Sequence, residues 1–166
     1  MKHIAIVILC SFLFFCGCAQ VSENTKPKKF PESVGYVNDF EKIFKDDEVD
    51  KLTELLEQFQ NKTTNQIAIL TIDSISPYEN IKNFNMDLFN EWGIGLKNEN
   101  NGLLITLSKN LRQVFITTGL GTEKILSDST CNSIVQAYMI PRFREGQYYE
   151  GVMKATKEII SIWGEE

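Results

Sequence analysis

The chain has 166 residues, and its 17 lysines and arginines against 22 aspartates and glutamates give a formal net charge of −5 at pH 7. With 43% hydrophobic and 23% charged residues, the composition is that of a globular domain with a sizeable core. The acidic balance and the lack of a run of lysines or arginines argue against nucleic acid as a partner.

The first residues have the order of a secretory signal peptide. Lys2 supplies the positive start, an apolar run follows over residues 4–16, and small residues lie on either side of Cys18. The run is too short for a permanent membrane span. A cysteine directly after a small residue resembles the lipobox of bacterial lipoproteins, where the signal is cut before the cysteine and the thiol is diacylated. An ordinary signal peptide with incidental cysteines is the alternative.

We therefore predict a lipoprotein signal peptide over residues 1–17 and lipidation at Cys18. The segment 18–33 is then the lipidated cysteine and a flexible tether, since residues 19–33 carry no periodic apolar pattern. Such a tether would hold the domain, over residues 34–163, roughly 20 Å from its anchor. The expected location is the cell envelope, anchored to a membrane and facing the periplasm or the exterior.

Removal of the signal also removes His3, the only histidine of the chain. Ser–His–Asp and Cys–His triads and histidine-bearing zinc sites are then excluded. The oxygen ligands that remain favour Ca²⁺ or Mg²⁺. Of the four cysteines only Cys131 would stay a free thiol, and its helical register with Ile134 and Tyr138 suggests a small buried hydrophobe rather than a reactive thiol.

Helical and strand patterns alternate after the tether. Hydrophobic residues recur at helical spacing over residues 49–59, and Asp46 or Asp47 is available as the N-cap. The short apolar run over residues 67–72 predicts a strand that is covered on both faces.

A second helix and a hairpin are expected next. Residues 76–79 form a capping box with proline at the first helical position, and Gly93 ends the helix that follows. Two further apolar runs, over residues 103–107 and 114–117, are separated by the polar residues 108–110, which predicts an antiparallel hairpin.

Two helices complete the pattern. One starts near Ser127 and bends or ends near Pro141, because proline removes an intrahelical hydrogen bond. The last helix is expected to bury Tyr148, Val152, Ala155 and Ile159. This order of elements predicts an α/β fold, with a small mixed sheet and helices on both of its faces.

Several loop motifs carry a family resemblance through their order and spacing. In chain order they are Tyr36-Val37-Asn38-Asp39, Trp92-Gly93-Ile94-Gly95, Asn101-Gly102, Gly119-Leu120-Gly121-Thr122-Glu123, Leu126-Ser127-Asp128 and Ile140-Pro141-Arg142-Phe143-Arg144-Glu145-Gly146-Gln147-Tyr148. Together they resemble the TPM domain family, whose members include a thylakoid-lumen acid phosphatase, a photosystem II repair protein and an acetylcholine-receptor modulator. The resemblance implies a three-layer αβα sandwich around a four-stranded sheet, in an extracytoplasmic and often membrane-tethered protein.

The resemblance also implies divalent-cation binding by acidic loops at one end of the sheet. Ligands of such sheets collect where loops leave the strand ends. We expect the ligands of Ca²⁺ or Mg²⁺ to come from Asp39, Glu99, Asn100, Glu123 and Asp128.

Each of these residues also has a structural alternative. Asp39 could cap the turn before the first helix, and Asp128 could be an N-cap. Gly119 and Gly121, just before Glu123, could provide a turn or bring backbone close to a ligand.

The chain departs from the family pattern beside this site. Asn100 stands where the family usually has an aspartate, so one ligand loses its charge, and Glu99 could replace it after a small loop shift. Lys124 stands where a glycine often follows the glutamate, which places a cation next to the expected metal.

Two functions compete at this stage. The first is a membrane-tethered, cation-binding module that assists the assembly or maintenance of a membrane protein complex. The second is a metal-dependent acid phosphatase, in which Asp39 or Glu123 orients water or attacks and Arg142 or Arg144 clamps phosphate. Both arginines could instead be solvated helix residues. The lack of a complete catalytic set favours the binding module.

Overall fold

The computed structural model of the chain describes residues 30–164. Four strands form one sheet in the order β1–β2–β3–β4. The strands β1 (Val37–Asp39), β2 (Gln66–Thr71) and β3 (Gly102–Ser108) run parallel, and β4 (Gln113–Thr118) returns antiparallel to β3. The predicted hairpin is therefore confirmed.

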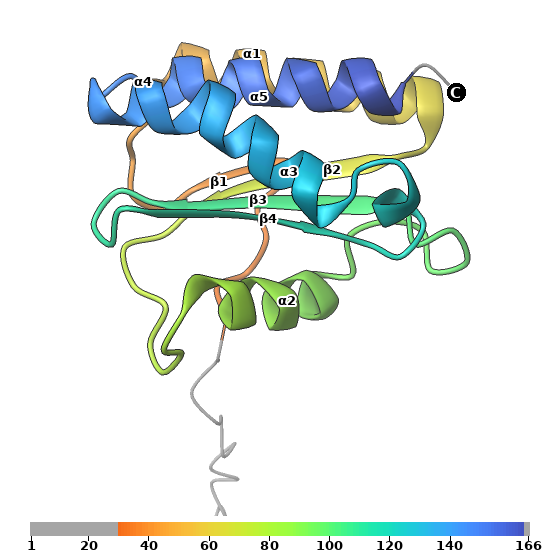
Figure 1. Cartoon of the computed structure of the whole chain (residues 1–166), viewed down its shortest axis with the longest axis horizontal. Helices are drawn as coiled ribbons and strands as arrows, with labels where there is room; N and C mark the ends of the chain where they lie inside the picture. Colours follow the sequence, from red (N-terminus) through yellow and green to blue (C-terminus); the bar gives the residue numbers. More distant parts are fainter. Residues whose placement is uncertain (1–29, 165–166) are drawn as a thin grey trace, which may run out of the picture.

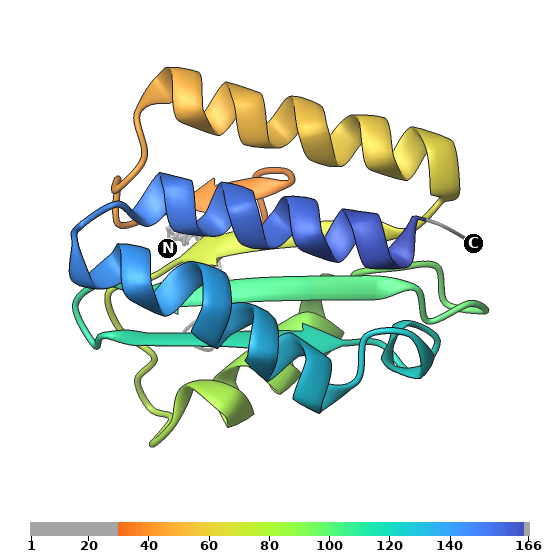
Figure 2. The ribbon, with the colours of Figure 1, turned by 45° about the horizontal axis from the view of Figure 1, so that its top comes forward.

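Helices cover both faces of this sheet. Figure 1 shows α2 alone on one face and the other helices on the opposite face, and Figure 2 shows α1 and α5 side by side. The predicted αβα sandwich is confirmed. The helices are α1 (Asp46–Thr63), α2 (Ile81–Trp92), α3 (Asp128–Ile134), α4 (Ile140–Arg144) and α5 (Tyr148–Trp163), with a 3₁₀ turn η1 (Thr122–Lys124) and a π-helical turn η2 (Val135–Met139).

Strand alternation divides the core between the two faces of the sheet. Ile69 and Ile105 lie in the cluster that α1 and α5 cover, whereas Leu70 and Leu104 lie in the cluster beneath α2. Every residue of β3 is buried, as expected for a central strand that is covered on both faces.

The sequence patterns alone did not predict β1, because three residues are too few to show alternation. Its position depends on pairing with the distant strand β2. The Asn38 side-chain nitrogen donates to the Ile69 carbonyl oxygen of that strand at 3.2 Å, and also to the nearby Gly35 carbonyl oxygen at 2.9 Å. This strand completes the four-stranded sheet that the family resemblance implies.

The start of α1 differs from the prediction. The helix begins at Asp46, so neither Asp46 nor Asp47 is the N-cap; that position belongs to Lys45, whose amide donates to the Glu48 carboxylate at 2.8 Å. The aspartates instead lie in the first turn, where negative charge is favoured by the helix dipole.

The start of α2 also differs. Residues 76–79 form turns outside the helix, and Asn80 is the N-cap, because its side-chain oxygen accepts the amide of Asn83 at 2.9 Å. The predicted end is confirmed, since Gly93 adopts the left-handed conformation with φ of 63°.

The predicted bend near Pro141 takes the form of a π-helical turn. The chain stays helical from α3 through η2 to α4, and the widened turn directly precedes the proline, which cannot donate a backbone hydrogen bond. The burial predicted for the last helix holds for Val152, Ala155 and Ile159, whereas Tyr148 is half-buried.

Packing of the domain begins before residue 34. The Phe30 side chain is buried, with its ring centroid 5.6 Å from that of Phe84, and the Trp92 indole nitrogen donates to the Pro31 carbonyl at 2.9 Å. The predicted lipidation residue Cys18 and the signal peptide lie outside the described residues. Within residues 30–164, no helix has the length and apolar character that crossing a bilayer requires.

A buried hydroxyl gives a first testable prediction. The Thr156 side chain in α5 is fully buried, and its Oγ1 has no hydrogen-bond partner among the residues that the structure describes. Thr156→Val removes this unsatisfied group while keeping the shape and the helix propensity, so we expect the free energy of unfolding to rise by about 1 kcal/mol. Urea denaturation measures this change.

Thr122→Val is the matched control. The Thr122 hydroxyl is equally buried but donates to the Gly102 carbonyl at 3.0 Å, so its removal should lower the free energy of unfolding by about 1 kcal/mol. Equal losses in both variants would show that Thr156 has a partner.

Candidate functional site

The direction of the strands separates the loops into two groups. Asp39 pairs with Thr71 at the carboxyl ends of the parallel strands, whereas Gln66 pairs with Gly102 at their amino ends. The six residues of β2 hold these two edges roughly 17 Å apart, at about 3.3 Å per residue. We call them the carboxyl edge and the amino edge.

The expected convergence of the five metal ligands is therefore wrong. Asp39 lies at the carboxyl edge. The loop that enters β3 and the turn that follows β4 lie at the amino edge, because β4 is antiparallel to β3. The four other candidates belong to those segments: Glu99, Asn100, Glu123 and Asp128.

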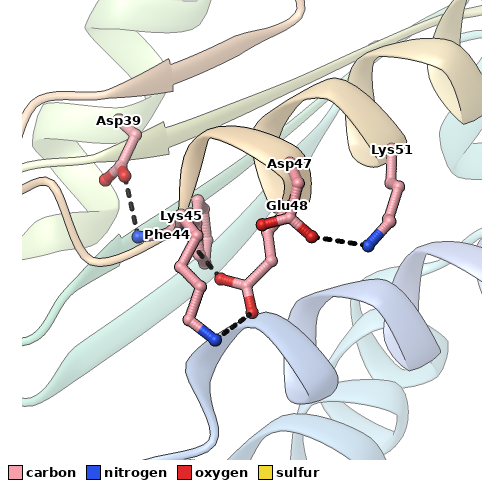
Figure 3. Close-up of polar contacts among 6 residues, drawn as sticks. All are labelled: Asp39, Phe44, Lys45, Asp47, Glu48 and Lys51. Atoms are coloured by element: carbon pink, nitrogen blue, oxygen red, sulfur yellow. Dashed lines mark hydrogen bonds and ion pairs between the residues drawn. The ribbon is translucent and has the colours of Figure 1, made fainter.

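Asp39 caps a loop. Its carboxylate accepts the amides of Ile43, at 3.2 Å, and Phe44, at 2.9 Å, as Figure 3 shows for Phe44. The Thr71 hydroxyl donates to the same carboxylate. Turn capping, the structural alternative for Asp39, is confirmed, and both carboxylate oxygens are occupied by protein donors.

The amino-edge candidates hold two loops together. The Glu99 carboxylate accepts the side-chain amide of Asn101 at 2.8 Å and the Thr64 hydroxyl at 3.3 Å. The Asn100 carbonyl accepts the amide of Gly121 at 3.1 Å. Within residues 30–164, no group of three or more histidine, cysteine or acidic side chains is placed to hold a metal ion. The described residues do not fit the expected site, and binding of Ca²⁺ or Mg²⁺ itself stays a prediction.

The glycines before Glu123 serve this loop packing. A Cβ atom on Gly121 would lie 2.1 Å from the Glu99 carbonyl oxygen, so only glycine permits such a close approach. The structural alternative for Asp128, a helix N-cap, is not observed either. Ser127 is the N-cap of α3, since its hydroxyl accepts the amide of Thr130 at 3.2 Å.

The carboxyl edge instead contains a cleft, between the β3–β4 turn and the α4–α5 turn. Both segments lie at the same end of the molecule in Figures 1 and 2. The cleft has a volume of about 680 Å³, which is within the range of ligand pockets. Its lining comprises Leu107, Ser108, Lys109, Arg112, Gln113, Val114, Ile140, Phe143, Arg144, Gly146 and Tyr148.

Three cations line this cleft, and none of them forms an ion pair within the described part of the chain. Among residues 30–164, no carboxylate forms an ion pair with Lys109, Arg112 or Arg144. The Lys109 ammonium lies 5.7 Å from the centre of the Tyr148 ring, which is a cation–π distance. Of the two arginines considered for a phosphate clamp, only Arg144 lines the cleft. Arg142 instead donates to the Tyr138 carbonyl at 3.2 Å.

The wall formed by the β3–β4 turn is fixed by hydrogen bonds. The Glu41 carboxylate accepts the amides of Lys109, at 2.8 Å, and Asn110, at 3.0 Å. The Ser108 hydroxyl accepts the amide of Leu111 at 3.0 Å. The backbone that carries the Lys109 and Arg112 side chains is therefore held in place before any ligand arrives.

Sequence reasoning identified only part of this cleft. The sequence predicts a phosphate-binding role for Arg144, but it places Lys109 in a polar turn and gives no signal at Arg112. One signal was available, because a hairpin turn that follows a parallel strand must lie at the carboxyl edge. Placing the α4–α5 turn beside it required the three-dimensional structure.

The family model of the TPM domain matches residues 37–162, most of the chain. The chain belongs to the TPM domain family. No curated protein matches the sequence.

Three solved structures share this TPM fold. The N-terminal domain of a protein from P. gingivalis is 28% identical, with a TM-score of 0.71, and the match covers 81% of this chain and 85% of that one. The N-terminal domain of the cg2496 protein from Corynebacterium glutamicum is 12% identical, with a TM-score of 0.61 and coverage of 81% and 84%. The BA42 protein from Bizionia argentinensis is 16% identical, with a TM-score of 0.60 and coverage of 75% and 86%.

The role of Asp39 gives a second prediction. Asp39→Asn places an amide group against backbone donors, so we expect the free energy of unfolding to fall by about 1–3 kcal/mol. The loss should be the same with and without millimolar Ca²⁺. Asp73→Asn is the control, since Asp73 is an exposed aspartate just beyond the neighbouring strand β2. A Ca²⁺-induced rise in Tm that only Asp39→Asn abolishes would instead make Asp39 a metal ligand.

Cys131 gives a third prediction. The side chain is buried, as expected from its helical register. Burial, and next the charge of Asp128, raise the pKa of the Cys131 thiol from 9.0 to about 11. Between these pH values the thiol ionises in the unfolded chain but not in the folded one, so stability is retained below the lower value and lost as the pH rises toward the higher one.

Comparison with Cys131→Ala isolates this effect from the other groups that titrate at high pH. We expect the wild type to lose more of its free energy of unfolding than Cys131→Ala over that pH interval, as measured by urea denaturation. Rapid alkylation of Cys131 in the folded chain at neutral pH would contradict the assignment of a buried, protonated thiol.

Proposed function

We propose that this TPM protein is a lipid-tethered, extracytoplasmic binding module that recognises an anionic group of a partner through the carboxyl-edge cleft. In this role it assists the assembly or maintenance of a membrane protein complex. The observation that carries the proposal is that three cations line one cleft of an acidic protein without an ion pair to any described residue. Cations gathered without internal counter-charges attract an external anion.

The lipid tether is proposed from the sequence alone. The signal-like N-terminus and the position of Cys18 after Gly17 support lipidation at the outer side of a membrane. The match to the TPM domain begins beyond this segment, at residue 37, which is consistent with an anchored domain.

A phosphatase is the second candidate, and the side chains of Arg112 and Arg144 favour it, because two guanidinium groups suit a phosphate. Hydrolysis also needs a group that orients water or accepts a proton. The described lining of the cleft contains no carboxylate, and Asp39 is occupied by its own loop. Binding without turnover is therefore the better-supported function.

Photo-crosslinking of the full chain in membranes tests this proposal. A crosslinker at Gln147, on the turn beside the cleft, should capture a partner protein, whereas one at Glu57, on the exposed surface of α1, should not. Capture should disappear when Lys109, Arg112 and Arg144 are all replaced by glutamine. Equal capture from both positions, or capture that survives the charge removal, would refute the proposal.

A further inference from the structure

The lining of the cleft is partly apolar and partly cationic. Its apolar lining comes from Leu107, Val114, Ile140, Phe143 and Tyr148. A small inorganic anion would satisfy the cations but would leave this apolar surface in contact with water. A ligand that uses the whole cleft therefore carries an apolar body as well as negative charge.

The cations lie on both walls of the cleft. Lys109 and Arg112 belong to the β3–β4 turn, whereas Arg144 is at the end of α4. A ligand lying between the walls is contacted by positive charge from two sides. A ligand that complements these two walls has an apolar group with an anionic group on each side of it.

An aromatic group suits the apolar lining of the cleft best. The Phe143 and Tyr148 rings lie 5.1 Å apart with an interplanar angle of 35°, and such paired rings offer surfaces for a third ring. Gly146, with φ of 75°, lies in the turn between them, and no atom approaches within 4 Å of a Cβ built there. The α4–α5 turn is thus uncrowded at Gly146, which also lines the cleft.

The position of the cleft favours a protein ligand over the membrane surface. Phe30, where the tether joins the domain, packs with the residues of α2 on one face of the sheet. The α4–α5 turn lies on the opposite face (Figure 1). A tether that enters at Phe30 therefore leaves the α4–α5 side of the cleft free to face away from the membrane.

We propose that the carboxyl-edge cleft binds an acidic peptide segment in which an aromatic side chain is flanked by carboxylates. The aromatic side chain packs on Phe143 and Tyr148, and the carboxylates pair with Arg144 on one wall and with Lys109 and Arg112 on the other. This inference rests on the proposed anion-binding function and adds the chemical class of the ligand.

Binding of three peptides to the full chain in detergent, measured by isothermal titration calorimetry, tests the inference. The peptides are Gly-Asp-Trp-Glu-Gly, the same peptide with a central glycine, and Gly-Lys-Trp-Lys-Gly, all with blocked ends. The first should bind, the second at least about tenfold more weakly through loss of the buried ring, and the third should not bind.

Charge variants identify the site. Arg112→Gln and Arg144→Gln should each weaken binding of the first peptide about fivefold, in line with partly desolvated ionic hydrogen bonds. Lys124→Gln, which removes an exposed cation at the amino edge, should leave it unchanged. These exposed side chains can be replaced without disturbing the core, and an unchanged Tm confirms that each variant is folded.

The possible failures are distinguishable. Equal binding of the peptides with central tryptophan and central glycine would overturn the aromatic requirement and leave the proposed anion-binding function intact. Binding of the lysine peptide, or insensitivity to both arginine variants, would overturn both. Tighter binding to phosphatidylglycerol vesicles than to the first peptide, lost in Arg144→Gln, would assign the cleft to lipid instead and overturn this inference.

Discussion

Parallel pairing of β2 with both of its neighbours determines which loops of this domain can meet. It places Asp39, Thr71 and the end of β3 at one edge, and the Glu99–Asn100 loop at the other. Asp39 then bridges β1 and β2 through the Thr71 hydroxyl and fixes the loop that leads into α1. The β3–β4 turn lies at the same edge, where the Glu41 carboxylate accepts two of its amides. This turn forms one wall of the cleft. The candidate site is thus a consequence of strand direction.

The concentration of positive charge distinguishes the cleft. Among the described residues only Lys45 and Lys51 form ion pairs, the latter with Asp47 at 2.6 Å on exposed helix α1, a pair of the kind that contributes little to stability. Cations without an ion pair also occur elsewhere on the described surface, but three of them line this one cleft. The cleft cations have no such partner among the described residues, although acidic residues outnumber basic ones in the chain. A hydrogen-bonded turn on one wall and the packed Phe143 and Tyr148 rings on the other limit the conformational entropy lost when a ligand binds.

Much of the fold was predictable because its elements have local signals. The apolar runs of β2, β3 and β4 and the stop at Gly93 are visible within a few residues. β1 was not predictable from pattern, because a three-residue strand is defined by its partner. The candidate site was harder to predict from the sequence. Acidic residues in a sequence do not show at which edge of the sheet their loops lie, so the sequence groups Asp39 with Glu123, whereas the strand directions separate them. The cleft depends on a contact between segments about 30 residues apart.

The central claim is that ligand recognition occurs at the carboxyl edge. Backbone amide chemical shifts, recorded by NMR while the full chain is titrated with Gly-Asp-Trp-Glu-Gly, test it most directly. The account predicts shifts concentrated at Lys109, Arg112, Gly146 and Tyr148, with Asn100 and Gly121 unchanged. Shifts concentrated at Asn100 and Gly121, or no shifts at saturating peptide, would contradict it.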